Sequence, residues 1–471
     1  MIREIIKQIR YKKITITELT QDCFNKIDKL NPELNAFITL NKDASIHKAR
    51  EYDSQITNSR DIDSIYEKHP LFGIPIAHKD IISTKGIETT AASNILREYF
   101  PPYNATIVNK LDEAGVIVLG KLNCDAFAHG ASGENSDFGP SKNPYNPKLI
   151  PGGSSSGSAV SVASGMTIFA TGTDTGGSLR TPASFTNTVG LKPTYGRVSR
   201  YGVIAMGSSL DSIGHITTTV EDSAYVLEIT SGFDPNDATT AKSQNTDFTS
   251  NLKAGVKGLK FGLPKEYFGG GIDSEILESV MRTVNIIERN GGYIEEISLP
   301  NTEYAIAVYY IIMPSEVSSN LGRFDGIRFG NKRESFGQEA KRRIMIGTYV
   351  LSAGYYDAYY EKAQKARQLI RKDFEDAFKK VDVILSPVTA VNPLKLGENI
   401  NDPLKMYLMD ILTTPANLAG IPAISVPSGF TKNGLPIGIQ LMGNYFNEEV
   451  LFRSGYVIEQ ENKLFNRKPL L

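Results

Sequence analysis

The sequence has 471 residues, 41% hydrophobic and 22% charged, which is typical of a globular protein with one large domain or two to three smaller ones. Its net charge of −1 excludes a chain that holds a nucleic-acid backbone through its own basic surface. Two cysteines, five scattered histidines and no apolar run near ~20 residues argue against a disulfide framework, a metal site and a membrane span. We therefore expect a cytoplasmic protein, with an organellar matrix as the alternative, and no metal or cofactor in this chain.

Residues 1–35 have the pattern of two amphipathic helices. The isoleucines of the first share one face: Ile2, Ile5, Ile6 and Ile9. Thr15 and Glu18 have the spacing of a capping box, which predicts the start of the second helix. Asn31-Pro32 predicts its end.

Short apolar runs rich in β-branched residues then alternate with helical patterns. They predict strands or strand–helix–strand units in GIPIAHKD (73–80), ATIVNKLDEAGVIVLGKLN (105–123), GMTIFATGTD (165–174), LKFGLPKEY (259–267) and VDVILSPV (381–388). Asp273 is the predicted cap of a helix that ends at Asn290-Gly291-Gly292. This alternation predicts an α/β fold with a central mixed sheet covered by helices on both faces.

A glycine- and serine-rich stretch, PGGSSSGSAV, occupies residues 151–160, and such runs are often flexible linkers. It lacks the lysine of a phosphate-binding loop, although an anion-binding nest of backbone N–H groups is an alternative interpretation. It also fits G-x-S-x-G around Ser155, but a nucleophile elbow needs a late histidine, and only His215 follows. No linker of unusual composition and no repeat divides the chain, so one domain over residues 1–471 is expected.

A serine nucleophile without histidine needs another base, and a buried lysine serves when desolvation lowers its pKa. Lys79 directly follows strand-forming residues, where burial is expected. A second stretch, GTDTGGSLRTPASF (172–185), places Ser178 after Thr175-Gly176-Gly177 and 24 residues beyond Ser154. Glycines before a nucleophile let backbone N–H groups face a developing oxyanion. Taken alone, this stretch also fits an ordinary turn with a helix-capping serine.

Together, Lys79, G-G-S-S-S-G-S at 152–158 and D-T-G-G-S-L-R at 174–180 resemble the amidase signature family. The resemblance implies that Ser178 is the nucleophile, that Ser154 is a bridging serine held by a cis peptide bond, and that Lys79 is the base. It also implies one amidase-signature domain. Its expected parts are N-terminal helices (1–60), a catalytic core (about 61–230) and a C-terminal part (about 231–471) that completes the sheet and substrate pocket. The expected oxyanion donors lie at Thr175, Gly176 and Gly177.

Further segments are similar to one branch of that family, the A subunits of glutamyl-tRNA(Gln) amidotransferases. They are residues 85–96, 130–144, 190–214, 318–330, 341–370 and 406–429. This resemblance implies hydrolysis of glutamine to glutamate and ammonia, and transfer of the ammonia to a B-type partner. That partner binds tRNA and uses ATP and magnesium to amidate Glu-tRNA(Gln), and a small C-type subunit completes a heterotrimer. A stand-alone amidase for small or aryl amides is the alternative, and a catalytically silent anion-binding scaffold is a third.

The branch's glutamine-binding positions are expected to match Tyr309, Arg343, Asp410 and Ser155. A guanidinium suits glutamine's α-carboxylate, and a carboxylate suits its α-ammonium. The adjacent Arg342 and Tyr310 are alternatives to Arg343 and Tyr309, because a slip of one residue fits the motifs as well.

The chain departs from the branch at three places. Family members usually read N-M-D-E-F-A-M-G where this chain has Cys124, Ala126 and His129 within residues 123–130, a change that borders the expected substrate pocket and bears on fine specificity. His78 precedes Lys79 and is expected to alter the lysine's pKa. The link between GIRFG (326–330) and KRRIM (341–345) is also shorter than usual, which predicts a trimmed surface loop or partner contact.

Overall fold

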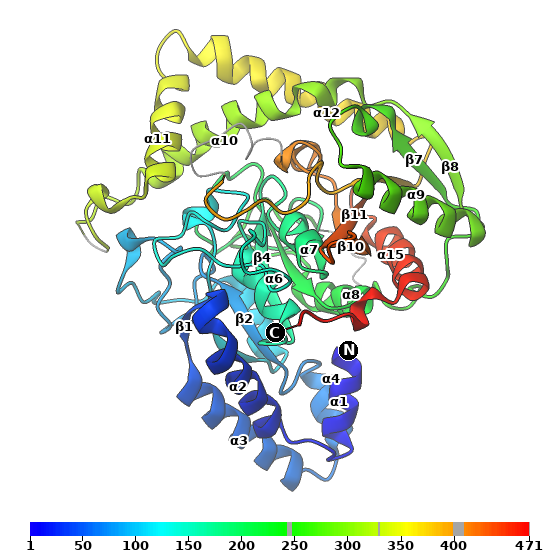
Figure 1. The fold of residues 1–471 in the computed structure, drawn as a ribbon. Coiled ribbons are helices and arrows are strands. Elements are labelled where there is room, and N and C mark those ends of the chain that lie inside the picture. Colours follow the sequence, from blue (N-terminus) through cyan, green and yellow to red (C-terminus); the bar gives the residue numbers. More distant parts are fainter. Residues whose placement is uncertain (243–246, 328–329, 399–408, 471) are drawn as a thin grey trace.

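The computed structural model describes residues 1–242, 247–327, 330–398 and 409–470. The motif segments quoted above include 328–329 and 406–408, which lie outside these ranges. Within them, one 11-stranded sheet has the order β1-β3-β2-β4-β6-β5-β10-β11-β9-β7-β8. Figure 1 shows β1 and β2 toward one side of the molecule and β7 and β8 toward the other. The strands are β1 (Phe37–Leu40), β2 (Pro75–Lys79), β3 (Ile117–Leu122), β4 (Phe169–Asp174), β5 (Val189–Lys192), β6 (Ser212–Thr217), β7 (Lys260–Pro264), β8 (Tyr293–Ile297), β9 (Val383–Pro387), β10 (Ala423–Phe430) and β11 (Pro436–Gly443).

The sheet is mixed. β2 pairs in parallel with β3 and β4, and β7 pairs in parallel with β8 and β9. The other pairings are antiparallel. The apolar runs expected to form strands do so as β2, β3, β4, β7 and β9. The α/β class and the central mixed sheet are therefore confirmed.

Helices surround the sheet. They are α1 (Ile2–Arg10), α2 (Ile16–Leu34), α3 (Lys42–Asn58), α4 (Ile62–Lys68), α5 (Thr106–Glu113), α6 (Ser156–Ala163), α7 (Arg180–Phe185), α8 (Val220–Thr230), α9 (Ser274–Arg289), α10 (Ala305–Leu321), α11 (Gln338–Val350), α12 (Lys362–Ala377), α14 (Thr414–Ala419) and α15 (Glu448–Asn462). Short 3₁₀ turns are η1 (Asn94–Leu96), η2 (Ala126–Ala128), η3 (Lys265–Phe268), η4 (Pro300–Tyr304), η5 (Arg333–Ser335) and η7 (Leu464–Asn466), and η6 (Tyr356–Glu361) is a π-helix. None of the helices in the described ranges is long and apolar enough to cross a membrane.

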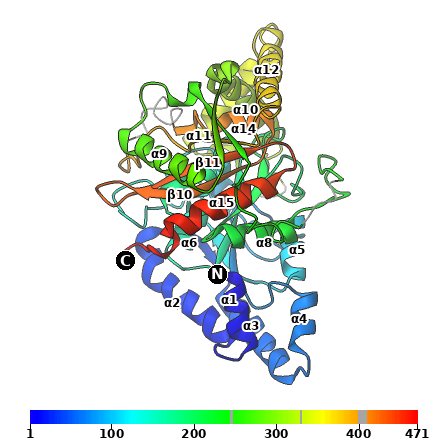
Figure 2. The ribbon, with the colours of Figure 1, turned by 90° about the vertical axis from the view of Figure 1, so that its right-hand side faces the viewer.

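Both faces of the sheet are covered, as expected. A Cβ at Gly438 of β11 would meet Ser184 of α7 at 2.8 Å, so this position faces α7. Val426, which pairs with the next residue of β11, instead lies against Gly455 of α15. Successive strand residues point to opposite faces, so α7 and α15 cover opposite sides. Figure 2 shows α15 beside α8 on its face, and the two helices are in contact.

The N-terminal helices confirm the predicted capping box and correct the predicted helix end. Thr15 Oγ1 accepts a hydrogen bond from Glu18 N (3.0 Å), and Glu18 Oε2 accepts one from Thr15 N (2.8 Å). The helix does not end at Asn31-Pro32. It continues to Leu34, because Pro32 removes one N–H donor without redirecting the last turn. The chain leaves the helix at Asn35, whose φ of 49° is left-handed.

Two helical groups extend the molecule beyond the sheet. Figure 1 shows α1 to α4 at one end and α10 and α11, which pack against each other, at the other end. The predicted helix after Asp273 is α9, and the Asp273 side chain accepts a hydrogen bond from Glu275 N. The division into parts near residues 60 and 230 stays a prediction.

Candidate active site

A fully buried lysine lies at the end of β2, which pairs with β3 on one side and β4 on the other. The Nζ of Lys79 donates to Ser154 Oγ at 2.8 Å, to Ser155 Oγ at 3.0 Å and to Thr173 Oγ1 at 2.9 Å. Burial lowers the pKa of Lys79 to about 8, although nearby acidic groups act in the opposite direction. A lysine with this pKa loses its proton far more readily than an exposed one, and Ser154 is placed to bring a proton to it.

The glycine- and serine-rich stretch is a buried loop that leads into α6, and it is not a linker. The peptide bond between Gly153 and Ser154 is cis, as the resemblance implies. A Cβ at Gly153 would overlap with Asp125 Oδ2, so only glycine fits here. The Asp125 carboxylate accepts hydrogen bonds from the backbone N–H groups of Gly133 and Asn135. These bonds brace the loop after β3, and Gly153 N, which donates to Ala131 O at 2.7 Å, joins that loop to the serine loop.

Ser178 lies in the turn between β4 and α7 and is 7% exposed. Its carbonyl accepts a hydrogen bond from Ser155 N at 3.1 Å, which ties the two serine loops together. Behind the turn, Asp174 and Arg180 form a buried ion pair with a distance of 3.0 Å between Oδ1 and Nη2. Burial acts to raise the pKa of Asp174, but the Arg180 guanidinium holds it well below its usual range. These contacts fix the turn that carries Ser178.

The backbone of this turn narrows the set of oxyanion donors. Gly177 N donates to Asp174 Oδ1 at 2.8 Å, and the predicted oxyanion role of Gly177 is therefore not supported by this geometry. The N–H groups of Thr175, Gly176 and Ser178 have no acceptor within the described ranges. Gly177 needs to be glycine for another reason, because its φ is 136° and a Cβ would overlap with Thr413 Oγ1.

Tyrosines from α10 cover the same turn. Tyr309 is 3% exposed, and a Cβ at Gly176 would lie 2.8 Å from its hydroxyl oxygen. Tyr310 packs edge-to-face against it at 5.1 Å between ring centroids and donates from its hydroxyl to Asp410 Oδ2 at 3.3 Å. Tyr309 therefore lies against the turn that carries Ser178, whereas Tyr310 contacts Asp410.

One of the two adjacent arginines of α11 points into this region. Arg343 is 4% exposed, its Nε donates to Glu339 Oε1 at 2.8 Å, and its guanidinium lies 5.7 Å from the centroid of the Tyr310 ring. The Arg342 side chain is 40% exposed. Burial raises the pKa of Asp410 to about 7, and Arg343 acts to lower it. The geometry favours Arg343 over Arg342, and it brings Arg343, Tyr310 and Asp410 together.

Comparison with known proteins identifies the family. Residues 18–452 match the Amidase family. This chain belongs to the amidase family. It is 47% identical over 485 aligned positions to the A subunit of the glutamyl-tRNA(Gln) amidotransferase from Geobacillus kaustophilus, with 100% of this chain and 99% of the relative covered. The crystal structure of the protein of that name from Thermotoga maritima superimposes with a TM-score of 0.81 at 43% identity, covering 96% and 95% of the two chains. A peptide amidase from Stenotrophomonas maltophilia superimposes with a TM-score of 0.82 at 28% identity, covering 99% and 97%.

The predictions of an amidase signature enzyme and of its resemblance to these A subunits are confirmed. The roles of single residues stay predictions, and the geometry bears on Ser155 as well as on Gly177. Ser155 was expected to bind substrate, yet it is fully buried, accepts from Lys79 and donates from Oγ to Thr173 O at 3.0 Å. The hydroxyl of Ser155 is therefore engaged by Lys79 and Thr173, and its predicted role in substrate binding stays a prediction.

Two departures from the family pattern have a plain structural outcome. His78 lies on the opposite face of β2 from Lys79, and its Nδ1 is 3.0 Å from Thr171 Oγ1. Burial and Lys121 lower its pKa to about 3, so it carries no charge. The expected influence of His78 on Lys79 was therefore wrong. Burial raises the pKa of Cys124 to about 12, which keeps its thiol protonated and unreactive.

Sequence reasoning missed Thr173 and the supporting carboxylate Asp125. Thr173 contacts Lys79 only because β4 is the parallel neighbour of β2, and a single sequence does not specify that neighbour. Asp125 lies within residues 123–130, where the sequence prediction concerned only the departures at Cys124, Ala126 and His129. No group of three His, Cys, Asp or Glu side chains in the described ranges is arranged to hold a metal ion.

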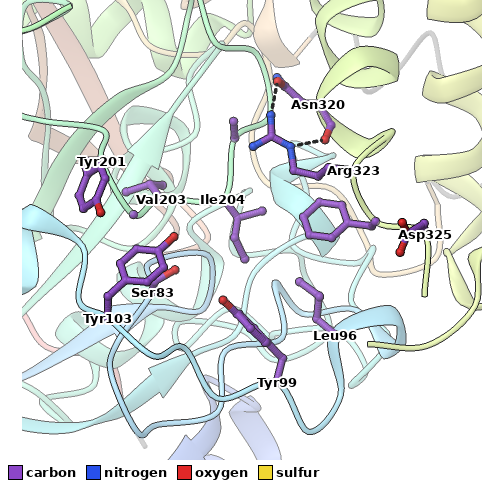
Figure 3. A pocket seen from close by; sticks show the side chains of 13 residues that line it. Ser83, Leu96, Tyr99, Tyr103, Tyr201, Val203, Ile204, Asn320, Arg323 and Asp325 are labelled. Atoms are coloured by element: carbon purple, nitrogen blue, oxygen red, sulfur yellow. Dashed lines mark hydrogen bonds between the residues drawn. The ribbon is translucent and has the colours of Figure 1, made fainter. Parts of the chain in front are cut away.

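Figure 3 shows a cavity of about 540 Å³ between residues of the loops after β2 and β5 and the end of α10. Aromatic and polar side chains line it, among them Tyr99, Tyr103, Tyr201, Asn320, Arg323 and Phe324. Lys79, Ser154 and Ser178 do not line it. Phe324 also packs against Phe127, at 5.4 Å between ring centroids, and so forms part of a wall between the cavity and the loop after β3.

Proposed function

We propose that this chain hydrolyses the side-chain amide of glutamine. The observation that carries the proposal is the 2.8 Å contact between Lys79 Nζ and Ser154 Oγ in a fully buried site beside the Ser178 turn. Desolvation makes the neutral lysine accessible near neutral pH, and neutral lysine is the form that accepts a proton.

Acyl transfer then proceeds in two steps. Ser178 Oγ bonds to the amide carbon while its proton passes to Ser154 Oγ, and the Ser154 proton passes to Lys79 Nζ. The negative oxygen faces N–H groups among those of Thr175, Gly176 and Ser178, which have no other acceptor within the described ranges. The same relay returns a proton to the leaving nitrogen, so ammonia departs and a Ser178 ester remains. Water attacks this ester with the relay as its base, and glutamate leaves.

The opposite end of the pocket suits the α-carbon of an amino acid. Arg343 offers a buried guanidinium to the α-carboxylate, and Asp410 offers a carboxylate to the α-ammonium. Tyr310 orients Asp410 by its hydroxyl. Tyr309 covers the nucleophile turn, and burial keeps the pKa of its hydroxyl above the usual range, so it acts as a neutral donor.

We further propose that the ammonia is passed to a B-type partner that converts Glu-tRNA(Gln) to Gln-tRNA(Gln) with ATP and magnesium. A small C-type subunit completes a cytoplasmic heterotrimer. The full-length similarity to amidotransferase A subunits supports this reading. A net charge of −1 agrees with tRNA being held mainly by the partner.

The test is a tagged purification of the full-length chain from its native cell, with its stoichiometric partners identified by mass spectrometry. Ammonia release from glutamine and from a simple aryl amide is then measured on the purified material. A B-type subunit in equal amount, with glutamine as the preferred substrate, is the expected result. A lone chain that hydrolyses the aryl amide but not glutamine would make this a stand-alone amidase and overturn the proposal.

A further inference from the structure

A buried histidine lies in the loop after β3 that contacts the serine loop, and the charge of Arg343 acts on it. His129 follows η2 in the loop after β3 and is 1% exposed. Asp125 N in the same loop donates to Ser154 O at 3.2 Å, and a Cβ at Gly130 would lie 2.5 Å from the Asp125 carboxyl carbon. The loop that carries His129 is therefore built directly against the proposed bridging serine.

The other side of the loop packs under α10 and α11. The ring of Phe127 lies 5.4 Å from that of Phe324, just after α10, and 5.5 Å from that of Phe336, just before α11. The α11 helix carries Arg343, whose positive charge acts on His129. Burial and this charge together lower the pKa of His129 well below 6.5, so its imidazole is neutral.

The backbone of His129 is satisfied, but its ring is not. Its N–H donates to Ala126 O, and its carbonyl accepts from Asn135 Nδ2. Neither Nδ1 nor Nε2 has a hydrogen-bond partner within the described part of the chain. Buried polar atoms are almost always paired, and leaving one unpaired is costly, so two such atoms on one side chain in the loop that contacts Ser154 indicate a missing ligand group.

The charge of Arg343 indicates which kind of ligand group would lie beside His129. A cationic group next to His129 would be repelled by Arg343, whereas an anion held by Arg343 would find the imidazole N–H as a further donor. We propose that His129 is a specificity-determining residue that donates a hydrogen bond to the α-carboxylate of the substrate. This inference rests on the proposed glutamine hydrolysis and adds a residue that the family pattern does not supply.

The test compares two substrates on the full-length chain with any partners that copurify. Glutamine carries the α-carboxylate, and 4-aminobutanamide lacks it. His129→Met removes the N–H at similar side-chain volume, and His129→Gln keeps an uncharged N–H donor. We expect His129→Met to raise KM for glutamine about tenfold or more, as for the loss of a hydrogen bond to a charged group, with little change in kcat. His129→Gln should restore part of the affinity, and 4-aminobutanamide turnover should be unaffected by either change.

The possible outcomes separate this inference from the proposed function. If His129→Met hydrolyses glutamine with the KM and kcat of the wild type, the role of His129 is overturned and the proposed function stands. Equal losses on both substrates, with a normal melting temperature, also overturn it, because the effect would not depend on the carboxylate. A wild type that hydrolyses 4-aminobutanamide but not glutamine overturns both.

Discussion

Lys79 Nζ lies 2.8 Å from Ser154 Oγ, and both residues are fully buried. A charged lysine in such a place is disfavoured, and burial lowers the Lys79 pKa to about 8. The relay needs the neutral amine, which is scarce below this pKa and predominates above it. The rate of the proposed reaction should therefore depend on pH through the fraction of Lys79 that is neutral.

We expect kcat to rise with pH by about tenfold per unit up to pH ~8 and then to level off. Ammonia release measured from mildly acidic to alkaline pH checks this profile. Lys79→Arg is expected to be inactive throughout, because a guanidinium with a pKa above ~12 stays charged. A flat wild-type profile would rule out Lys79 as the base.

Ser178→Ala should abolish ammonia release, by a factor on the order of 10⁴ or more, because the acyl-enzyme cannot form. The fold should be unaffected, since the substitution removes one hydroxyl and keeps the backbone bond from Ser155 N to Ser178 O that ties the two serine loops together. The matched control is Ser156→Ala, which removes a hydroxyl of the other serine loop that bonds to Ser141 and not to Lys79. Comparable activity in the two variants would refute the assignment of Ser178 as nucleophile.

The strands and the lysine could be predicted because β2 and β4 begin with apolar residues and contain β-branched ones, and such strand-forming residues directly before Lys79 make its burial foreseeable. The contact between Lys79 and Thr173 could not be predicted, because it depends on which strands are neighbours and on the register of their pairing. Sequence separation carries no such information for parallel strands, since their connections are long.

The predicted oxyanion donors illustrate a second limit. Thr175, Gly176 and Gly177 look equivalent in the sequence, but the Asp174 side chain turns back and accepts from Gly177 N. A carboxylate that caps its own turn is a matter of one side-chain rotamer, which residue type alone does not decide. The choice between Arg342 and Arg343 likewise depends on which side of α11 is buried, and the sequence alone does not specify that side.

Replacing Arg343 tests that choice. We expect Arg343→Ala to raise KM for glutamine about 10- to 100-fold, because a charge-assisted hydrogen bond to the α-carboxylate is lost. Arg342→Ala, one residue away on an exposed part of the helix, should leave KM unchanged. Steady-state kinetics on both variants decide the matter, and the reverse pattern would assign the role to Arg342.

Asp410 should give the affinity for glutamine its own pH dependence. Burial raises its pKa to about 7, so it is largely protonated below this pH and cannot pair with an ammonium group. KM is therefore expected to fall as pH rises through about 7 and then to stay constant. Asp410→Asn should raise KM and remove this inflection, whereas Tyr310→Phe should keep the inflection. A wild-type KM that is independent of pH across this range would contradict the assignment.

The ion pair behind the nucleophile turn should control stability as well as activity. Arg180 is fully buried and donates to Asp174, Asn417, Gln440 and Thr413, so it joins the turn to β11 and α14. Arg180→Met leaves Asp174 buried without its cation and is expected to cost about 3–5 kcal/mol of unfolding free energy. Urea denaturation measures this loss. Adding Asp174→Asn to Arg180→Met should recover part of it, because the uncompensated charge is removed. A loss below about 1 kcal/mol in the single variant would mean that the neighbouring amides, and not the arginine, keep the carboxylate stable.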